Sequence, residues 1–404
     1  MPPQDPEAGL DRPGKPDQTP SALDVLVANH RVIICCGPGG VGKTTMAAVL
    51  ALQAARQGRE ACVVTVDPAR RLADALGVES LDNNPSRLSG NWTGGFHAVM
   101  LDTKGTFDDL ILRHARSPEQ ARAIQANPIY QSLTSVLSGT QEYMAMEKLY
   151  ELNERPDFDT LVIDTPPSRN ALDLLDAPTR LIRFLENRIF RALFMPTRAY
   201  LRALSIATHA LLRTISRVAG REIVDDAVDF FRAFHGLEEG FRLRAASIRA
   251  VLADPATAYV IVTSPQPDTL EEAEYFTSRL ALNDISIAAV IVNRMHPNFD
   301  TVRDLPSFDS NVPGPVIEDE ALRKQLSVLR KNLDELRTAA RLDQDAVSAF
   351  ASRVDAPLVT VPLLDFDVHD LDSLGRLADH LFGGPIPRSV APKRQRQPAP
   401  HTLG

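Results

Sequence analysis

The feature that most constrains this chain is a glycine-rich loop at residues 37–44. The segment Gly37-Pro38-Gly39-Gly40-Val41-Gly42-Lys43-Thr44 fits G-x-x-x-x-G-K-[ST], the phosphate-binding loop. The apolar run 31–36 before it is typical of a buried strand, and the Ala/Leu-rich segment 44–57 after it is typical of a helix. Strand, loop and helix form the context that this motif requires. We therefore expect the loop to bind a nucleoside triphosphate.

Each residue type in the loop has a chemical reason. Glycines let successive backbone N–H groups turn toward phosphate oxygens, and the positive end of the helix dipole adds to the attraction. We expect Lys43 to reach the β- and γ-phosphates and the Thr44 hydroxyl to ligate Mg²⁺. The remaining phosphate contacts are expected from Gly37, Gly39, Gly40, Val41 and Gly42.

The rest of the chain predicts an α/β fold. Short continuous apolar runs alternate with helical stretches, which is typical of a mostly parallel sheet covered by helices on both faces. The runs are 31–36, 61–66, 96–101, 160–163, 258–262, 287–292 and 358–361. The fold class is therefore a P-loop NTPase sheet, and its ligand is expected beyond the carboxyl ends of the strands.

Polar residues follow three of these runs. Asp164 stands where a carboxylate can order the Mg²⁺ shell, usually through water, and Asp67 can orient or deprotonate the attacking water. Asn293 ends a later strand, and residues 165–168 are interpreted as a mobile loop able to sense the γ-phosphate. A single aspartate at a strand end is also common as a helix cap, so Asp67 and Asp164 support a site only together with the phosphate loop at the same end of the sheet.

The domain organisation follows from composition. Pro-rich polar ends are expected to be disordered, and a helical pattern with little strand signal interrupts the sheet pattern. The predicted parts are a disordered tail 1–20, an ATPase domain 21–385 built from 31–175 and 253–385, a helical insertion 176–252, and a disordered basic tail 386–404.

The insertion carries an uneven charge. Between Arg180 and Arg221 there are nine arginines and one acid, Glu186. One interpretation is an ordinary helical insertion whose arginines face water. The other is an amphipathic, basic module for a hydrophobic or acidic partner, or for a membrane surface.

A second charged segment, 317–353, has leucines at 322, 326, 329, 333 and 336. This 4-3-4-3 spacing is typical of a helix that packs against a neighbour or pairs as a short coiled coil. Of the two, we predict packing on its own domain.

The whole composition limits the class of protein. The net charge of −8 gives no reason to expect a nucleic-acid partner. No run of eighteen apolar residues predicts a membrane span, and the polar, Pro-rich start does not resemble a signal peptide. The three cysteines, Cys35, Cys36 and Cys62, fall in predicted buried strands without a C-x-x-C pair. A cytoplasmic location is expected, with peripheral membrane association as an extension of it.

These motifs resemble the ArsA/tail-anchored-protein-targeting ATPases (anion-transporting-ATPase-like), a P-loop family of the deviant Walker A type. The segment 139–147 and the sequence P-P-S-R-N at 166–170 are most similar to the actinobacterial paired members. The resemblance implies an ATPase that uses ATP and Mg²⁺ and works as a dimer. The matching segments are the loop 37–45, the first switch 65–69, the second switch 164–168 with 171–175, and the strand ends 292–294 and 361–364.

The resemblance also assigns roles to further residues. It implies that Thr45 helps to hold the α-phosphate, that Asp67 activates water, and that Asn293 with Pro362 and Leu363 frames adenine. One position departs from the family: the signature lysine, second in the loop, is Pro38 here. In typical members that lysine crosses the dimer interface to the partner's nucleotide.

Because Pro38 cannot supply that contact, we expect a heterodimer with a homologous, lysine-bearing subunit, and a homodimer is the alternative. The expected function is ATP-driven conformational change coupled to binding of a hydrophobic or membrane-protein client, with 176–252 as the client module. The core position of all three cysteines argues against arsenite transport. The main alternative is a nucleotide-binding structural subunit that scaffolds an active paralogue without hydrolysing ATP. A membrane- or DNA-positioning ATPase is a third reading, and the arginines permit lipid without favouring DNA.

Overall fold

The computed structural model describes most of the chain. The described residues are 21–66, 70–128, 130–131, 140–165, 176–180, 183, 226, 229–230, 232–299 and 320–382. The expected tails 1–20 and 386–404, most of the insertion 176–252, and Asp67 lie outside them.

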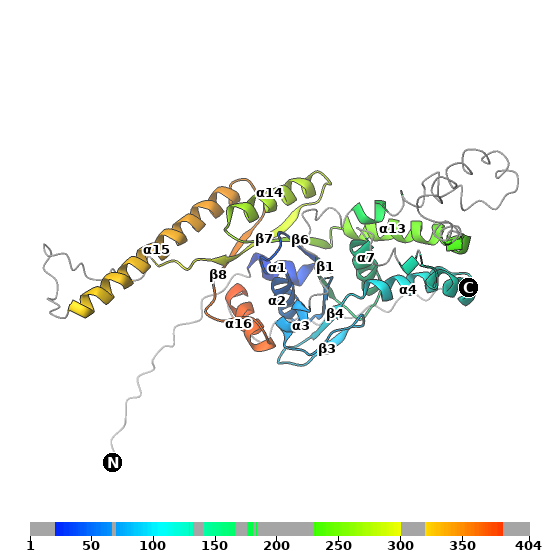
Figure 1. Ribbon diagram of the computed structural model, residues 1–404, viewed down its shortest axis with the longest axis horizontal. Helices are drawn as coiled ribbons and strands as arrows, with labels where there is room; N and C mark the ends of the chain where they lie inside the picture. Colours follow the sequence, from blue (N-terminus) through cyan, green and yellow to red (C-terminus); the bar gives the residue numbers. More distant parts are fainter. Residues whose placement is uncertain are drawn as a thin grey trace, which may run out of the picture.

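The centre of the protein is one eight-stranded sheet with the order β3-β4-β2-β5-β1-β6-β7-β8 (Figure 1). All neighbouring strands are parallel except β3, which pairs antiparallel with β4 at one edge. The strands are β1 Val32–Cys36, β2 Glu60–Thr65, β3 Ser86–Leu88, β4 Gly95–Met100, β5 Thr160–Asp164, β6 Thr257–Thr263, β7 Ile287–Met295 and β8 Leu358–Pro362.

Helices cover both faces of the sheet and form two separate apolar cores. On β1, Ile33 and Cys35 point into one core while Val32, Ile34 and Cys36 point into the other, as the alternation of side chains along a strand requires. One face carries α1 Ala22–Asn29, α2 Lys43–Arg56, α3 Arg71–Leu76 and α16 Leu371–Phe382. The other carries α4 Thr103–His114, α5 Pro118–Gln125, α7 Thr140–Asn153, α13 Glu238–Leu252, α14 Pro267–Ala281 and the end of α15 Glu320–Ala351.

The predicted fold class is confirmed, and each predicted strand lies within one or two residues of an observed one, except that β7 extends three residues further. The sequence pattern missed β3. This strand has three residues, of which only Leu88 is buried, so it lacks the apolar run that marks the central strands. Within the described part of the chain, no helix is both long enough and apolar enough to cross a membrane.

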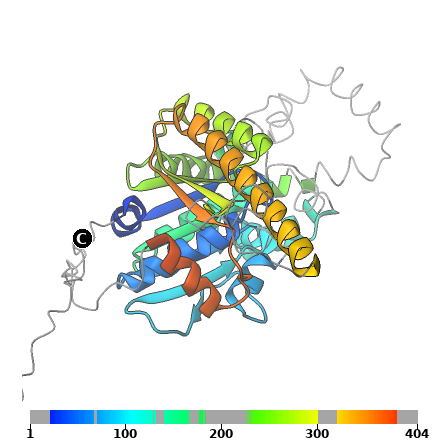
Figure 2. The same cartoon turned by 90° about the vertical axis from the view of Figure 1, so that its left-hand side faces the viewer.

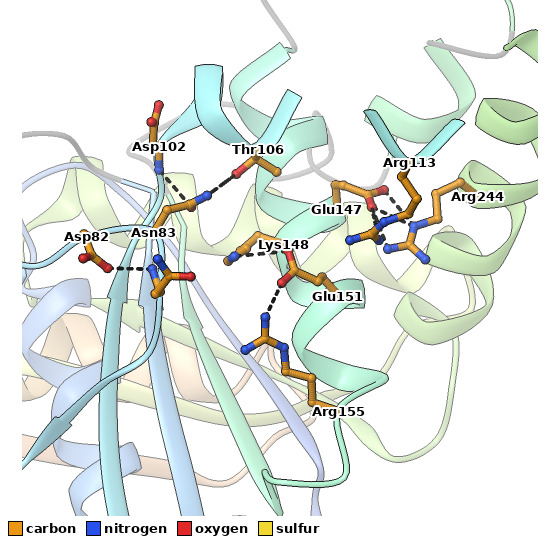
Figure 3. Close-up of polar contacts among 11 residues, drawn as sticks. Asp82, Asn83, Asp102, Thr106, Arg113, Glu147, Lys148, Glu151, Arg155 and Arg244 are labelled. Carbon is orange, nitrogen blue, oxygen red and sulfur yellow. Dashed lines mark hydrogen bonds and ion pairs between the residues drawn. The ribbon is translucent and has the colours of Figure 1, made fainter. Parts of the chain in front are cut away.

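An ionic cluster around the buried Glu147 joins three helices of the second face, α4, α7 and α13 (Figure 3). The Glu147 carboxylate on α7 accepts hydrogen bonds of 2.7 and 3.0 Å from Nε of Arg244 on α13. Arg113 of α4 lies 3.9 Å from the same carboxylate, and the Arg244 guanidinium stacks 3.9 Å from the centre of the Tyr150 ring. The cluster therefore ties α13, the last helix before β6, to the helix that leads into β5.

The long helix α15 packs differently along its length. Its C-terminal part buries Ala340, Val347 and Phe350 near α14 and β7. Its N-terminal part projects away from the sheet, where Figure 1 draws it in yellow. The prediction that the leucines of 322–336 pack on their own domain is therefore wrong for Leu322, Leu329 and Leu336, which are between 42% and 56% exposed. Among the described residues, the domain surface ends before it reaches these three leucines.

Candidate functional site

The phosphate loop connects β1 to α2 with a backbone that only glycine can supply at key points. Gly37, Gly40 and Gly42 have φ values of 141°, 77° and 95°, in the region that L side chains rarely adopt. A Cβ on Gly37 would lie 2.0 Å from the carbonyl oxygen of Val262, and one on Gly42 would lie 2.5 Å from Nδ2 of Asn293. The loop is thus confined between the ends of β1, β6 and β7.

Lys43 is the first residue of α2 and is almost fully buried. Its Nζ donates a 2.6 Å hydrogen bond to the backbone carbonyl of Pro38 across the loop. Burial lowers the pKa of Lys43, and the Asp164 carboxylate acts in the opposite direction. A buried ammonium group with one backbone acceptor is suited to exchange that acceptor for phosphate oxygens.

A buried carboxylate lies beside the loop at the end of β5. The Oδ2 atom of Asp164 accepts hydrogen bonds from Oγ1 of Thr44 at 2.7 Å and from Oγ1 of Thr65 at 2.8 Å. The register places Asp164 level with Thr65 of β2 on one side and with Cys35 of β1 on the other. The hydroxyl and carboxylate oxygens form the hard donor set that Mg²⁺ prefers, so the residues fit this metal ion. The two predicted metal residues, Thr44 and Asp164, are therefore in direct contact.

Thr65 is a site residue that sequence reasoning missed. In the sequence, Thr65 is marked only by being a hydroxyl residue two positions before Asp67. Its contact with Asp164 depends on the pairing of β2 with β5. Because Thr65 belongs to the strand next to β5, it can hold Asp164 in place if Thr44 turns toward a metal ion.

Removing this hydroxyl gives a testable result. Thr65→Val is expected to lower ATPase activity or raise the Mg²⁺ concentration for half-maximal activity by about tenfold, because supporting groups of metal sites contribute about 10–100-fold. Thr65→Ser should restore wild-type Mg²⁺ dependence. Thr263→Val is the matched control, since Thr263 is also fully buried at a strand end but bonds to the carbonyl of Thr269. Equal Mg²⁺ curves for Thr65→Val and wild type would contradict this role.

The predicted adenine residues lie together at the β7–β8 side of the same edge. Asn293 donates from Nδ2 to the carbonyl of Val41 at 2.8 Å and so touches the phosphate loop itself. Pro362 pairs with Met295, and the N–H of Leu363 donates to the carbonyl of Met295 at 2.7 Å. Leu363 is exposed and Pro362 half-buried. An adenine role for these residues stays a prediction.

The other predicted residues divide into two groups. Thr45 is half-buried in the first turn of α2, while Gly39 and Gly40 are exposed at the tip of the loop. Asp67, residues 166–168 of the second switch and 171–175 after it lie outside the described residues. The structure does describe the residues that lead into both switches. β2 ends at Thr65, before the first switch residue Asp67, and the Thr165 hydroxyl at the start of the second switch donates to the carbonyl of Cys35 at 2.8 Å.

Comparison with known proteins decides the family. A family model described as "Anion-transporting ATPase" matches residues 30–308, more than half of the chain. The chain belongs to the anion-transporting ATPase family. The match includes the phosphate loop, Asp164 and Asn293.

Curated relatives agree with this assignment. An uncharacterized protein of Streptomyces coelicolor is 32% identical over 319 residues, which are 78% of this chain and 73% of that protein. A protein of Aquifex aeolicus named as an arsenical pump-driving ATPase is 22% identical over 89% of this chain and 81% of its own length. ATPase GET3B of Arabidopsis thaliana is 25% identical over 91% of this chain and 83% of its own length. These relatives thus match this chain along most of its length.

The cysteines of this anion-transporting ATPase family member lie in the core. Cys35 and Cys36 are on β1 and Cys62 is on β2, and all three are buried. Burial raises the pKa of Cys36 and of Cys62 to about 12. The thiols therefore stay protonated at neutral pH, which makes them poor ligands for a metalloid.

Proposed function

We propose that this chain is a Mg²⁺-dependent ATPase that hydrolyses ATP at the phosphate loop. The observation that carries the proposal is the meeting of Thr44 and Thr65 on the Asp164 carboxylate, next to the buried Lys43. A phosphoryl-transfer site needs a cation for the transferred phosphate, a metal holder and a group for the attacking water. The first two are adjacent here, and Asp67 is proposed for the third.

Each residue then has a defined task. Lys43 would exchange the Pro38 carbonyl for β- and γ-phosphate oxygens, and Thr44 and Asp164 would hold Mg²⁺. When bound, Mg²⁺ neutralises the charge that develops on the phosphates. The residues proposed for the phosphates are Gly37, Gly39, Gly40, Val41, Gly42 and Thr45, and those for adenine are Asn293, Pro362 and Leu363.

We also propose that the ATPase works in the cytoplasm as one subunit of a dimer. The loop resembles the deviant type, with Pro38 in place of the lysine that reaches a partner's nucleotide in typical members. A homologous, lysine-bearing subunit would complete the site of this chain, whereas a homodimer would have two sites without that lysine. Nucleotide-driven opening and closing would then control binding of a hydrophobic client at 176–252. Similarity to the GET3 ATPases supports this class of function.

One observation favours a second candidate, a subunit that binds ATP without turning it over. Pro38 is buried within its own subunit, so position 38 offers neither charge nor an exposed side chain to a neighbour. Such a chain would scaffold an active paralogue.

The deciding experiment measures ATP hydrolysis by the purified chain alone and mixed with a homologous lysine-bearing subunit. Turnover is expected to rise in the mixture and to fall about a hundredfold or more with Asp67→Asn in this chain, because the amide cannot accept the proton of the attacking water. Asp74→Asn, on the exposed side of α3, is the control. If the mixture hydrolyses ATP at the same rate with Asp67→Asn as with the wild-type chain, this chain is the scaffold and the catalytic proposal is wrong.

A further inference from the structure

The seven-residue pattern of α15 continues beyond the part that the domain covers. In the buried part, Val347 and Phe350 share a core with residues of α14 and β7, Ala340 is also buried, and Asp343 on the same stripe accepts a 2.7 Å hydrogen bond from His296. Toward the N-terminus the same positions are all leucine. They are Leu322, Leu326, Leu329, Leu333 and Leu336, named here the leucine seam.

The leucine seam lies in the projecting part of the helix. Figure 1 shows this part extending past the body of the protein, and Figure 2, seen from that side, shows the helix lying in front of the body. Leu322, Leu329 and Leu336 are exposed, and Leu326 and Leu333 are only partly covered. At 1.5 Å per residue the seam is about 21 Å long, which is enough for two heptads of a coiled coil.

A helix of this kind is normally stabilised by a partner. Most helices gain their stability from packing of an apolar face, and a row of leucines at a/d spacing is the surface that another helix covers. Apart from Val328, the residues between the leucines from 323 to 335 are polar or charged, so the seam is narrow and suits one helix better than a broad surface.

The flanks of the seam indicate which helix would fit. With the leucines at a and d, the e flank carries arginine at every seventh residue, 323, 330 and 337, and the g flank carries Gln325, Asn332 and Ala339. Arg330 is exposed, and Arg337 is half-buried with a guanidinium nitrogen 3.9 Å from Asp334.

The leucine seam of a second copy of this chain would not provide opposite charges to the arginines of the e flank. In an antiparallel pair the e flanks face each other, which would bring arginine against arginine. In a parallel pair Arg330 and Arg337 would face the uncharged Gln325 and Asn332 and gain no opposite charge. A helix with acidic residues beside its apolar positions would instead pair with the e flank.

We propose that the leucine seam binds a helix from a different protein chain, with apolar a and d positions and Glu or Asp facing the exposed Arg330. The seam would thus be a coiled-coil docking site for an acidic partner. This inference does not rest on the proposed ATPase function, because none of its residues belongs to the nucleotide site.

The test uses the full chain and two synthetic 28-residue peptides labelled with fluorescein. Both have leucine at a and d, and they carry glutamate or lysine at e and g. Binding is measured by fluorescence anisotropy with wild type, Leu329→Gln/Leu333→Gln, Arg330→Glu and Val328→Gln. Glutamine keeps helix propensity, and Val328 is the matched control because it is 52% exposed but lies off the seam.

The glutamate peptide is expected to bind at least about tenfold more tightly than the lysine peptide, since e/g charges set partner choice. Leu329→Gln/Leu333→Gln should remove binding, Arg330→Glu should lower the preference, and Val328→Gln should change neither. Circular dichroism of each variant checks that α15 is still folded. Equal or absent binding of the two peptides would overturn the proposal. So would sedimentation showing a dimer of the chain alone that Leu329→Gln/Leu333→Gln dissociates, because a second copy would then occupy the seam.

Discussion

Replacing Lys43 with methionine is expected to lower ATP hydrolysis by about a hundredfold or more, because one preorganised cation at a phosphoryl-transfer site is worth about that much. Methionine keeps the apolar stem of a side chain that is 6% exposed and removes only the charge. Since burial already disfavours the charged form of Lys43, the variant should unfold at the same temperature as wild type or a higher one. Steady-state hydrolysis and thermal unfolding with and without ATP measure both effects.

Lys148→Met is the matched control for this prediction. Lys148 is also buried, but its Nζ pairs with Glu151 at 3.1 Å, away from the phosphate loop. Its loss should lower the unfolding temperature while leaving the KM for ATP unchanged. A Lys43→Met variant that hydrolyses ATP at the wild-type rate would remove this lysine from the mechanism.

The largest expected loss of stability comes from Glu147→Gln. The Glu147 side chain is 3% exposed and faces two arginines, so the neutral amide leaves their charges uncompensated in a mostly buried site. Removing one partner of a buried ion pair costs about 3–5 kcal/mol, and the exposure of Arg113 places the estimate at the lower end, about 3 kcal/mol. Urea unfolding measures this loss in the free energy of unfolding.

Two further variants test the cause. Glu239→Gln breaks an exposed pair with Arg242 on the same helix and should change the free energy of unfolding far less than Glu147→Gln does. The double variant Glu147→Gln/Arg244→Met should be more stable than Glu147→Gln alone, because the buried cation is removed as well. If the second substitution adds to the loss, charge is not the reason for the effect of the first.

The sheet was predictable because its central strands are buried on both faces and appear as unbroken apolar runs. The contact of Thr44 with Asp164 was also within reach, since both follow from one motif at one edge of the sheet. The contact of Thr65 with Asp164 could not be predicted in the same way. It depends on β2 and β5 being neighbours in the sheet, and no local sequence pattern indicates the order of the strands.

Long-range partners explain the other differences. Glu147 belongs to a recognisable segment, but its partner Arg244 lies 97 residues later and after the insertion. The heptad pattern of α15 correctly predicted a helix with an apolar stripe. It could not tell where the domain surface ends beneath that helix, which decides that Val347 and Phe350 are buried and Leu329 is not.

Residue 38 has two separable functions in the loop. Its main chain accepts the hydrogen bond from Lys43, and its side chain decides which contact the loop can make with a partner subunit. The acceptor is a main-chain oxygen, which every amino acid provides, so the resting place of the lysine amine does not depend on the side chain at residue 38. The side chain at position 38 can therefore differ between subunits without changing the position of the lysine amine in the nucleotide-free loop. After a gene duplication, a single substitution at position 38 could leave one copy with the lysine that contacts the partner's nucleotide and the other copy as the receiver of that contact. The conformation of the loop would be the same in both copies.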